Sequence, residues 1–339
     1  MKKPYLRRLA LVMGLTVMGL WLLWTCLTLL YSNVQPSGVR KAMAGGYLVW
    51  LIVAAFFLRP RKVRMRALAF SGAALTLVFS VTSPSNERQW APDVAQVAMA
   101  EIDGDRMTLQ NVRNFRYRSQ EDFDERWETR EYDLAKLRTL DLFMSYWGPV
   151  DYCHTILSFG FEGGEQLAVS VEVRNEVGEA FSTLGGFFKM FELSYIFADE
   201  RDVVLLRTNH RHEDVYLYRL RASQERMREL LLAYVDFANE LALTPEFYDV
   251  IDNSCGVNIL HRIADIGQTT WSGRNALLNG YWDRLMYKRG AIHQGLPFEE
   301  LRALSLINEP AQMMGDVPGY SAGIRADLPV APEPLETGS

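Results

Sequence analysis

The residue best suited to chemistry is Cys255, which lies in the segment Asp252–Asn258 (DNSCGVN). This segment is typical of a turn that opens a helix, and we expect a helix to begin near Ser254. At a helix N-terminus the free backbone N–H groups and the helix dipole stabilise the thiolate, which is the reactive form of cysteine. The backbone N–H of the cysteine itself can also donate to an oxyanion. The sequence therefore makes Cys255 the candidate nucleophile.

The chain has two other cysteines, and they bear on this hypothesis in different ways. Cys26 lies inside a long apolar run, where a small buried side chain is the default interpretation. Cys153 falls in the C-terminal part of the chain, as Cys255 does, and two cysteines in an oxidising compartment can form a disulfide. A Cys153–Cys255 disulfide would remove the nucleophile, and the sequence leaves this alternative open.

A cysteine nucleophile usually works with a base, and His154 is the candidate among the five histidines. His210 and His212 lie in a charged turn and are most simply solvated, although a His-x-His pair beside acids can bind a metal. His261 shares the expected helix with the cysteine but lies on another face, and His293 lies in a loop. His154 opens an apolar strand, where the alternative is a structural histidine. We expect no metal and no organic cofactor.

Glu172 is the candidate for the group that orients His154. Strands expected at 154–161 and 166–174 form a hairpin, and if its loop is Glu162-Gly163-Gly164, residues whose numbers add up to 326 face each other. His154 then lies opposite Glu172 on one face of the hairpin. A two-residue Gly163-Gly164 turn would shift the register and separate them. The alternative interpretation of Glu172 is an ordinary solvated strand acid.

The elements around these residues predict one α+β domain with an antiparallel sheet over residues 93–326. Two more hairpins are expected, at 96–102 with 106–115 and at 203–208 with 214–220. Ser223 can cap a helix that runs to about Leu243. One face of that helix is apolar, with Met227, Leu230, Leu231, Tyr234, Val235, Ala238 and Leu241. The tail 327–339 is rich in proline and acid, and we expect it to be loose.

The first quarter of the chain differs sharply from the rest in charge. Eleven of the 36 Lys and Arg residues and none of the 41 Asp and Glu residues lie within 1–84, which leaves 25 basic against 41 acidic residues elsewhere. Three apolar runs, at about 9–31, 42–58 and 67–83, can cross a membrane as helices. We therefore expect 1–84 to be a membrane anchor with three transmembrane helices. A cleaved signal peptide is the alternative for the first run, but that run is too long.

The positions of the cations predict the orientation of this anchor. Four cations precede the first run and five lie within 59–66, whereas only Arg40 and Lys41 separate the first two runs. The positive-inside rule then puts the N-terminus and 59–66 in the cytoplasm, and residue 85 onward on the other side. We expect a multi-pass protein of the bacterial inner membrane with its C-terminal domain in the periplasm. If one of the three runs did not cross the membrane, residue 85 onward would lie in the cytoplasm instead.

Several short motifs together resemble the Lnb N-terminal periplasmic domain family over roughly residues 108–325. The motifs are Asn111–Phe115, Trp127–Arg130, Tyr146–Gly148, His154–Phe159, Ser170–Arg174, Tyr216–Tyr218 and Asn253–Cys255. This family is similar to the permuted papain-like (NlpC-like) enzymes, in which histidine precedes cysteine in the chain. The order His154, Glu172, Cys255 agrees with that pattern, and Cys153 departs from it.

The resemblance implies Cys255 as nucleophile, His154 as general base and Glu172 as the orienting acid. It also implies an activity like that of a lipoprotein N-acyltransferase, which moves a fatty acyl chain onto the amino group of a lipidated N-terminal cysteine. The implied partners are phospholipid or lipoprotein acyl groups and the inner membrane, with no nucleic acid. Two alternatives remain: a peptidoglycan amidase or endopeptidase with the same Cys-His pair, and a non-catalytic envelope binding or assembly domain.

Overall fold

The computed structural model describes residues 3–266 and 278–329, and its internal contacts divide the chain into two units. The first unit comprises Met1–Ser85, Gly178–Glu192 and Phe247–Asp249. The second comprises Asn86–Val177, Leu193–Glu246 and Val250–Ser339. Two short segments from later in the chain therefore group with the N-terminal helices, and the first of them ends where β9 begins.

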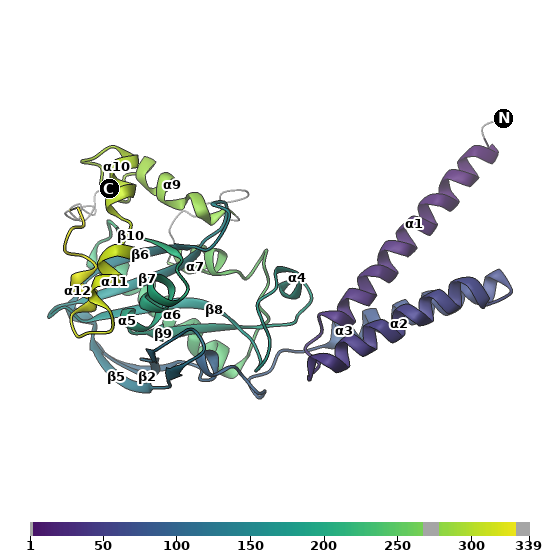
Figure 1. Cartoon of the computed structure of the whole chain (residues 1–339), viewed down its shortest axis with the longest axis horizontal. Coiled ribbons are helices and arrows are strands. Elements are labelled where there is room, and N and C mark those ends of the chain that lie inside the picture. The colour runs from purple at the N-terminus through teal and green to yellow at the C-terminus, as the bar shows by residue number, and fades with distance from the viewer. Residues whose placement is uncertain (1–2, 267–277, 330–339) are drawn as a thin grey trace. The chain divides into compact units, whose positions relative to one another are not determined.

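Three long helices make up most of the first unit: α1 (Lys3–Leu30), α2 (Ser37–Phe57) and α3 (Arg61–Val81) (Figure 1). By length and composition all three can cross a membrane, which agrees in number with the three spans predicted from the sequence. α2 and α3 begin five and six residues before the apolar runs, because the polar and basic residues ahead of each run continue the helix. The unit also contains the short helix α4 (Thr183–Gly186).

Close packing holds the three long helices together. Leu22, Ala54 and Leu68, one from each helix, form a small buried cluster. Trp21 donates from Nε1 to Oγ1 of Thr76 at 3.0 Å, which joins α1 to α3. Glycine is needed at position 72, because a Cβ atom there would lie 2.9 Å from the Trp21 ring. The first unit is thus a packed bundle whose remaining surface is largely apolar.

The second unit is built on one sheet, and the described residues contribute eight strands to it. Their order is β1-β2-β9-β8-β7-β6-β10, with β5 paired to β2. The strands are β1 (Met99–Asp103), β2 (Arg106–Arg113), β5 (Trp127–Asp133), β6 (Leu137–Tyr146), β7 (His154–Phe161), β8 (Gln166–Arg174), β9 (Glu192–Ala198) and β10 (Asp214–Arg219). β2 and β9 pair in parallel, whereas β6, β7, β8 and β10 form antiparallel pairs. A separate ribbon joins β3 (Arg116–Tyr117) and β4 (Phe123–Asp124). The unit is therefore of mixed α+β class.

Two of the three predicted hairpins are confirmed. β1 and β2 form the first, although both strands are shorter than predicted. β7 and β8 form the second, and the pairing of Ile156 with Ser170 gives the register in which residue numbers add up to 326. Gly163 and Gly164 in its loop have φ angles of 92° and 90°, which glycine adopts without strain.

The third predicted hairpin is wrong in its first strand. Residues 203–208 are helical: α5 (Glu200–Leu205) continues into a π-helical turn, η3 (Leu206–His210). Asp199 caps α5 by accepting from the backbone N–H of Arg201 at 3.1 Å. The run of apolar residues looks like a strand because every residue of it is buried, and burial on all sides removes the helical periodicity. Only the second strand, β10, is as predicted.

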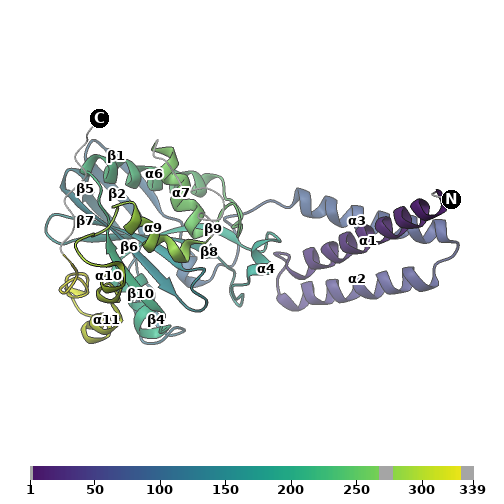
Figure 2. The same ribbon diagram turned by 90° about the horizontal axis from the view of Figure 1, so that it is seen from above.

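Helices cover both faces of the sheet (Figures 1 and 2). α5, α11 (Asn308–Met314) and α12 (Tyr320–Gly323) pack in one cluster with Ile156 of β7. Phe159 points to the opposite face, where its ring packs edge-on against Tyr234 of α6 (Gln224–Leu243) at 6.5 Å. The predicted cap of α6, Ser223, and its predicted apolar face are confirmed.

The remaining helices and turns follow the sheet in the chain or connect its strands. They are η1 (Pro92–Val94), η2 (Leu134–Lys136), α7 (Cys255–Asp265), η4 (Asn279–Tyr281), α9 (Trp282–Lys288) and α10 (Phe298–Leu304). At the C-terminus, Leu328 still packs against the core. Residues 330–339 of the predicted loose tail lie outside the described residues.

Candidate active site

Cys255 is the first residue of α7, as the sequence predicts. Asn258 fixes the turn before it: its backbone N–H donates to the carbonyl of Ser254 at 2.9 Å, and its Nδ2 donates to Oδ1 of Asn253 at 2.9 Å. Tyr195 of β9 donates to Oδ1 of Asn258 at 2.8 Å, which ties the helix start to the sheet. The thiol therefore stands at the N-terminus of a helix held against the sheet.

The alternative of a disulfide is not realised, because Cys26, Cys153 and Cys255 are all free. Sγ of Cys255 lies 3.9 Å from the carbonyl oxygen of Cys153, within reach of a weak S–H hydrogen bond. Cys153 itself is buried, and its burial raises the pKa of its thiol well above the usual value. Cys255 is therefore the more reactive of these two thiols.

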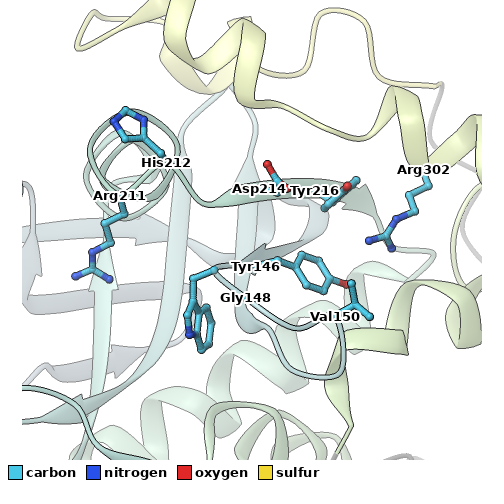
Figure 3. A pocket seen from close by; sticks show the side chains of 9 residues that line it. Tyr146, Gly148, Val150, Arg211, His212, Asp214, Tyr216 and Arg302 are labelled. Atoms are coloured by element: carbon cyan, nitrogen blue, oxygen red, sulfur yellow. The ribbon is translucent and has the colours of Figure 1, made fainter.

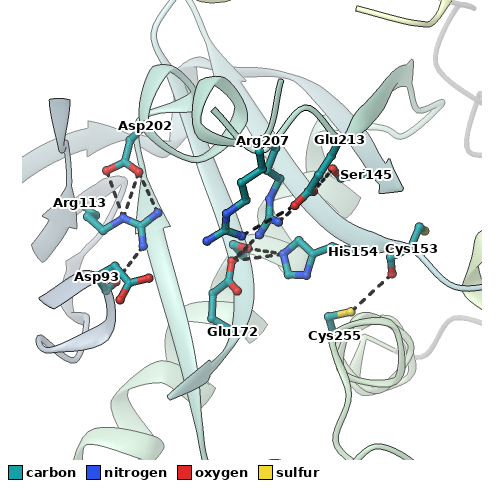
Figure 4. Close-up of polar contacts among 12 residues, drawn as sticks. Asp93, Arg113, Ser145, Cys153, His154, Glu172, Asp202, Arg207, Glu213 and Cys255 are labelled. Atoms are coloured by element: carbon teal, nitrogen blue, oxygen red, sulfur yellow. Dashed lines mark hydrogen bonds and ion pairs between the residues drawn. The ribbon is translucent and has the colours of Figure 1, made fainter. Parts of the chain in front are cut away.

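His154 and Glu172 lie close together on the β7–β8 hairpin (Figure 4). They are connected through Ser170, which lies on the same face of the hairpin. Oγ of Ser170 donates to Oε1 of Glu172 at 2.6 Å. Because its single proton is used there, Ser170 accepts from Nε2 of His154 at 2.7 Å. Nε2 also lies 3.3 Å from Oε1 of Glu172. This arrangement fixes the ring of His154 and leaves Nδ1 as the nitrogen that can take a proton from a thiol.

A buried arginine, Arg207, binds the carboxylate of Glu172. Arg207, in the π-helical turn η3, donates to Oε1 of Glu172 at 2.9 Å and to Oε2 of Glu213 at 3.3 Å. Ser145 donates to the same oxygen of Glu213 at 2.5 Å and stands beside His154 in the register of β6 and β7. The imidazole therefore belongs to a buried network with two carboxylates and one guanidinium.

The charges of this network shift the pKa values of the candidate residues. Burial and the neighbouring Arg207 lower the pKa of His154, but Glu172 and the hydrogen bond with Cys255 outweigh them and raise it to about 9. For Glu172, burial acts to raise the pKa, but His154 and Arg207 hold it well below the usual value. Burial likewise opposes ionisation of Cys255, yet the hydrogen bond and charge of His154 lower its pKa. The site therefore favours a thiolate beside an imidazolium.

Asn279 is a further polar side chain at the thiol, and its amide joins two segments of the site. Its Oδ1 accepts from the backbone N–H of Cys153 at 3.1 Å, and its Nδ2 donates to the carbonyl of Cys153 at 2.7 Å. Nδ2 also lies 4.0 Å from Sγ of Cys255. A Cβ atom at Gly256 would come within 3.1 Å of the same Nδ2, so glycine there permits the close approach.

A cavity of about 290 Å³ lies beside this network (Figure 3). Its residues include the chain neighbours of Ser145 and Glu213. The lining is Tyr146, Trp147, Gly148, Val150, Arg211, His212, Asp214, Tyr216 and Arg302. The three candidate residues do not line it. The cavity combines aromatic rings with charged groups, and it opens next to the strand ends that carry the site.

The other histidines contribute little to the site. His210 packs against Tyr117, with the ring centroids 6.1 Å apart, and burial lowers its pKa. His212 lines the cavity beside the site. His261 is exposed on α7. In the part of the chain that the structure describes, no group of three or more His, Cys, Asp or Glu residues is placed to hold a metal ion.

Comparison with known families identifies the central part of the chain. Residues 123–279 match the family model of the Lnb N-terminal periplasmic domain, a range that includes His154, Glu172, Cys255 and Asn279. No curated protein and no solved structure matches the chain. The family resemblance predicted from the sequence is thus confirmed. Residues 123–279 are therefore similar to the Lnb N-terminal periplasmic domain, and they follow three N-terminal helices that are long and apolar enough to cross a membrane.

Proposed function

We propose that this protein is a periplasmic cysteine acyltransferase, held by three helices in the bacterial inner membrane, that acts on lipid-linked acyl groups. N-acylation of lipoproteins is the proposed reaction. The observation that carries the proposal is geometric: Cys255 is a free thiol at the N-terminus of α7, and the ring of His154 is held by Ser170 and Glu172. A strand-borne histidine that precedes a cysteine at a helix N-terminus also supports a permuted papain-like arrangement.

In the proposed reaction the acyl group passes through Cys255. The thiolate attacks the carbonyl carbon of an acyl ester, and a C–S bond forms. The tetrahedral intermediate collapses with cleavage of the ester C–O bond, and the imidazolium of His154 gives its proton to the leaving alcohol. An amine then attacks the thioester, His154 takes the amine proton, and cleavage of the C–S bond leaves an amide and a free Cys255.

The negative oxygen of each tetrahedral intermediate needs hydrogen-bond donors. Cys255 is the first residue of α7, so its backbone N–H has no acceptor within the helix. Asn279 can supply the second donor: one hydrogen of Nδ2 is used by the carbonyl of Cys153, and the other remains on a nitrogen 4.0 Å from Sγ of Cys255. We assign these two groups to the oxyanion hole of the proposed reaction.

A peptidoglycan amidase or endopeptidase remains the second candidate. The observation in its favour is the cavity beside the site, because its aromatic and charged lining suits a polar substrate better than an acyl chain. The same thiol and histidine would then open an amide bond. The two candidates differ in what is lost without Cys255: N-acylated lipoproteins in the first case and cleaved peptidoglycan in the second.

The test replaces Cys255 with Ala in the full-length protein, in cells that have no other lipoprotein N-acyltransferase. N-terminal peptides of lipoproteins are then analysed by mass spectrometry, with Cys26→Ala as the matched control because Cys26 is another free thiol of the same chain. We expect Cys255→Ala to abolish N-acylation and Cys26→Ala to retain it. Unchanged N-acylation in Cys255→Ala would refute acyl transfer, and altered muropeptides in its place would support the amidase.

A further inference from the structure

The segment Gly178–Glu192 follows the sheet strand β8 in the chain, yet it packs with the N-terminal helices. Between Glu179 and Lys189 it contains nine successive residues without charge, AFSTLGGFF. Within this stretch lies α4, capped by Ser182, whose Oγ accepts from the backbone N–H of Gly185 at 3.3 Å. The segment is thus an ordered, apolar part of the unit that contains the three long helices.

Polar contacts fix this segment at one end of the helix bundle. Glu179 accepts from Arg40, at the start of α2, at 2.6 Å and from Gln35, just before α2, at 2.7 Å. Lys189 donates from Nζ to the carbonyl oxygens of Phe79 and Thr82, at the end of α3, at 3.0 and 3.3 Å. In a chain that crosses the membrane three times, the start of α2 and the end of α3 lie on the same side, where the chain continues into the Lnb domain.

Aromatic contacts show how deep the segment reaches along the bundle. Phe188 stacks on Tyr31, just after α1, with ring centroids 5.8 Å apart, and it also approaches Trp24 of α1 at 6.4 Å. Trp24 precedes Tyr31 by two helical turns, which is about 10 Å along the axis. Phe188 therefore lies between the end of α1 and a point well inside the apolar part of that helix.

Three large apolar side chains of this segment are only partly covered by protein, although Phe181 packs against Phe191 and Tyr248. Phe181, Leu184 and Phe187 are 53%, 49% and 40% exposed. Leu184 and Phe187 are three residues apart across α4 and so project from the same side. Leaving such side chains in water costs about 25 cal/mol per Å² of apolar surface. The same segment packs through Phe188 on Trp24 and Tyr31, and Trp and Tyr are enriched where helices leave the membrane, so lipid is the cover that fits these side chains.

We propose that Gly178–Glu192 is a membrane-interface segment whose Phe181, Leu184 and Phe187 side chains insert into the periplasmic leaflet of the bilayer. The segment then forms a second contact between the Lnb domain and the membrane, in addition to the covalent link after α3. Arg40 with Glu179, and Lys189, would lie at the level of the lipid headgroups, where charged groups stay hydrated.

The test places the photo-crosslinking residue p-benzoyl-phenylalanine at position 181, 184 or 187 of the full-length protein in its native membrane. Leu20 of α1, 62% exposed, is the positive control for a lipid-facing site. Met313 of α11, 78% exposed, is an apolar control in the other unit. After irradiation, mass spectrometry of the labelled peptides counts phospholipid adducts, and a melting curve of each variant verifies folding.

We expect lipid adducts at 184 and 187 in yields comparable to those at position 20, and at least about tenfold fewer at position 313. Adducts at position 20 without adducts at 181, 184 and 187 would overturn the proposal. Equal yields at 187 and 313 would overturn it as well, because the reaction would then not depend on insertion. None of these outcomes depends on the activity of Cys255.

Discussion

At the scale of single residues, the site is governed by the opposite pKa shifts of Cys255 and His154. Glu172 carries a negative charge next to the imidazole, and Arg207 keeps that carboxylate ionised while opposing the full rise in the pKa of His154. The result is a histidine with a pKa of about 9 beside a thiol whose pKa is lowered. These opposite shifts favour the ion pair of thiolate and imidazolium over the neutral pair.

This state predicts a bell-shaped dependence of acyl transfer on pH. Below the lowered pKa of Cys255 the thiolate gains a proton, and above about pH 9 His154 loses the proton that the leaving group needs, so the rate falls on both sides. Alkylation of Cys255 by iodoacetamide, followed by peptide mass spectrometry, reports the thiolate alone and should be fast already at pH 7. In His154→Gln the reactive form should appear only at or above the ordinary thiol pKa of about 8.5, because burial then acts without the charge of His154. Equal alkylation profiles for the two proteins would contradict the ion pair.

The assignment of Asn279 predicts a selective defect. Asn279→Ala should lower kcat for acyl transfer by about 10²–10³-fold with little change in KM, because the lost donor acts on the oxyanion. Alkylation of Cys255 by iodoacetamide forms no oxyanion, so its rate should change less than about threefold. If both reactions slowed equally, Asn279 would act only by holding the backbone of Cys153, to which it is also bonded.

The sequence could predict the pair His154 and Glu172, because both belong to one hairpin whose loop fixes the register. It could not predict Arg207 or Asn279. Arg207 lies in a segment whose buried apolar residues resemble a strand, and Asn279 is 126 positions from Cys153. Contacts between segments so far apart depend on the packing of the whole domain, and no local pattern encodes them. The hydrogen bonds of Ser170 to His154 and Glu172 became evident only from the distances.

At the scale of elements, the sequence was most informative where a helix or a hairpin carries its own start and stop signals. α6 has a serine cap and a single apolar face, and both could be read directly. α5 has an aspartate cap but no polar face, since even Glu200 and Asp202 are buried against Arg325 and Arg113. Helices whose charged residues pair inside the core lose the periodicity that identifies them. α4 has only four residues, which is too short for an apolar periodicity to indicate a helix.

The close packing of η4 against the loop before β7 can be tested by adding one methyl group to a glycine. η4 approaches the loop before β7 so closely that a Cβ atom at Gly280 would lie 1.9 Å from the carbonyl oxygen of Val150. Gly280→Ala must therefore displace backbone, and we expect a loss of about 3 kcal/mol of stability and a lower melting temperature. Gly148→Ala is the matched control, since no atom lies within 4 Å of its Cβ position. Equal melting temperatures for the two variants would show that the loop and η4 are not in close contact.

At the scale of the whole molecule, the charge pattern and the three helices bear on the same question, which is where the Lnb domain lies. The basic residues of 59–66 flank the end of α2 and the start of α3, whereas 1–84 contains no acid at all. A domain on the periplasmic side can reach lipid-linked substrates of the outer leaflet and is exposed to oxidising conditions. Cys153 and Cys255 are nevertheless both free in this structure, and Cys153 is buried.

The orientation makes a prediction that can be measured with reporter fusions. Alkaline phosphatase folds into its active form only in the periplasm, so a fusion after residue 85 should be active and a fusion within 59–66 should be inactive. Green fluorescent protein at the same two positions should give the opposite result, because it fluoresces when it folds in the cytoplasm. The physical reason is the five cations of 59–66, which resist transfer across the membrane, whereas the region between the first two apolar runs has only Arg40 and Lys41, near the start of α2. Replacing all five cations with Gln should reduce the difference between the fusions. An active phosphatase within 59–66 of the native sequence would place the C-terminal domain in the cytoplasm. The domain could then not reach the periplasmic acyl acceptors on which the proposed function depends.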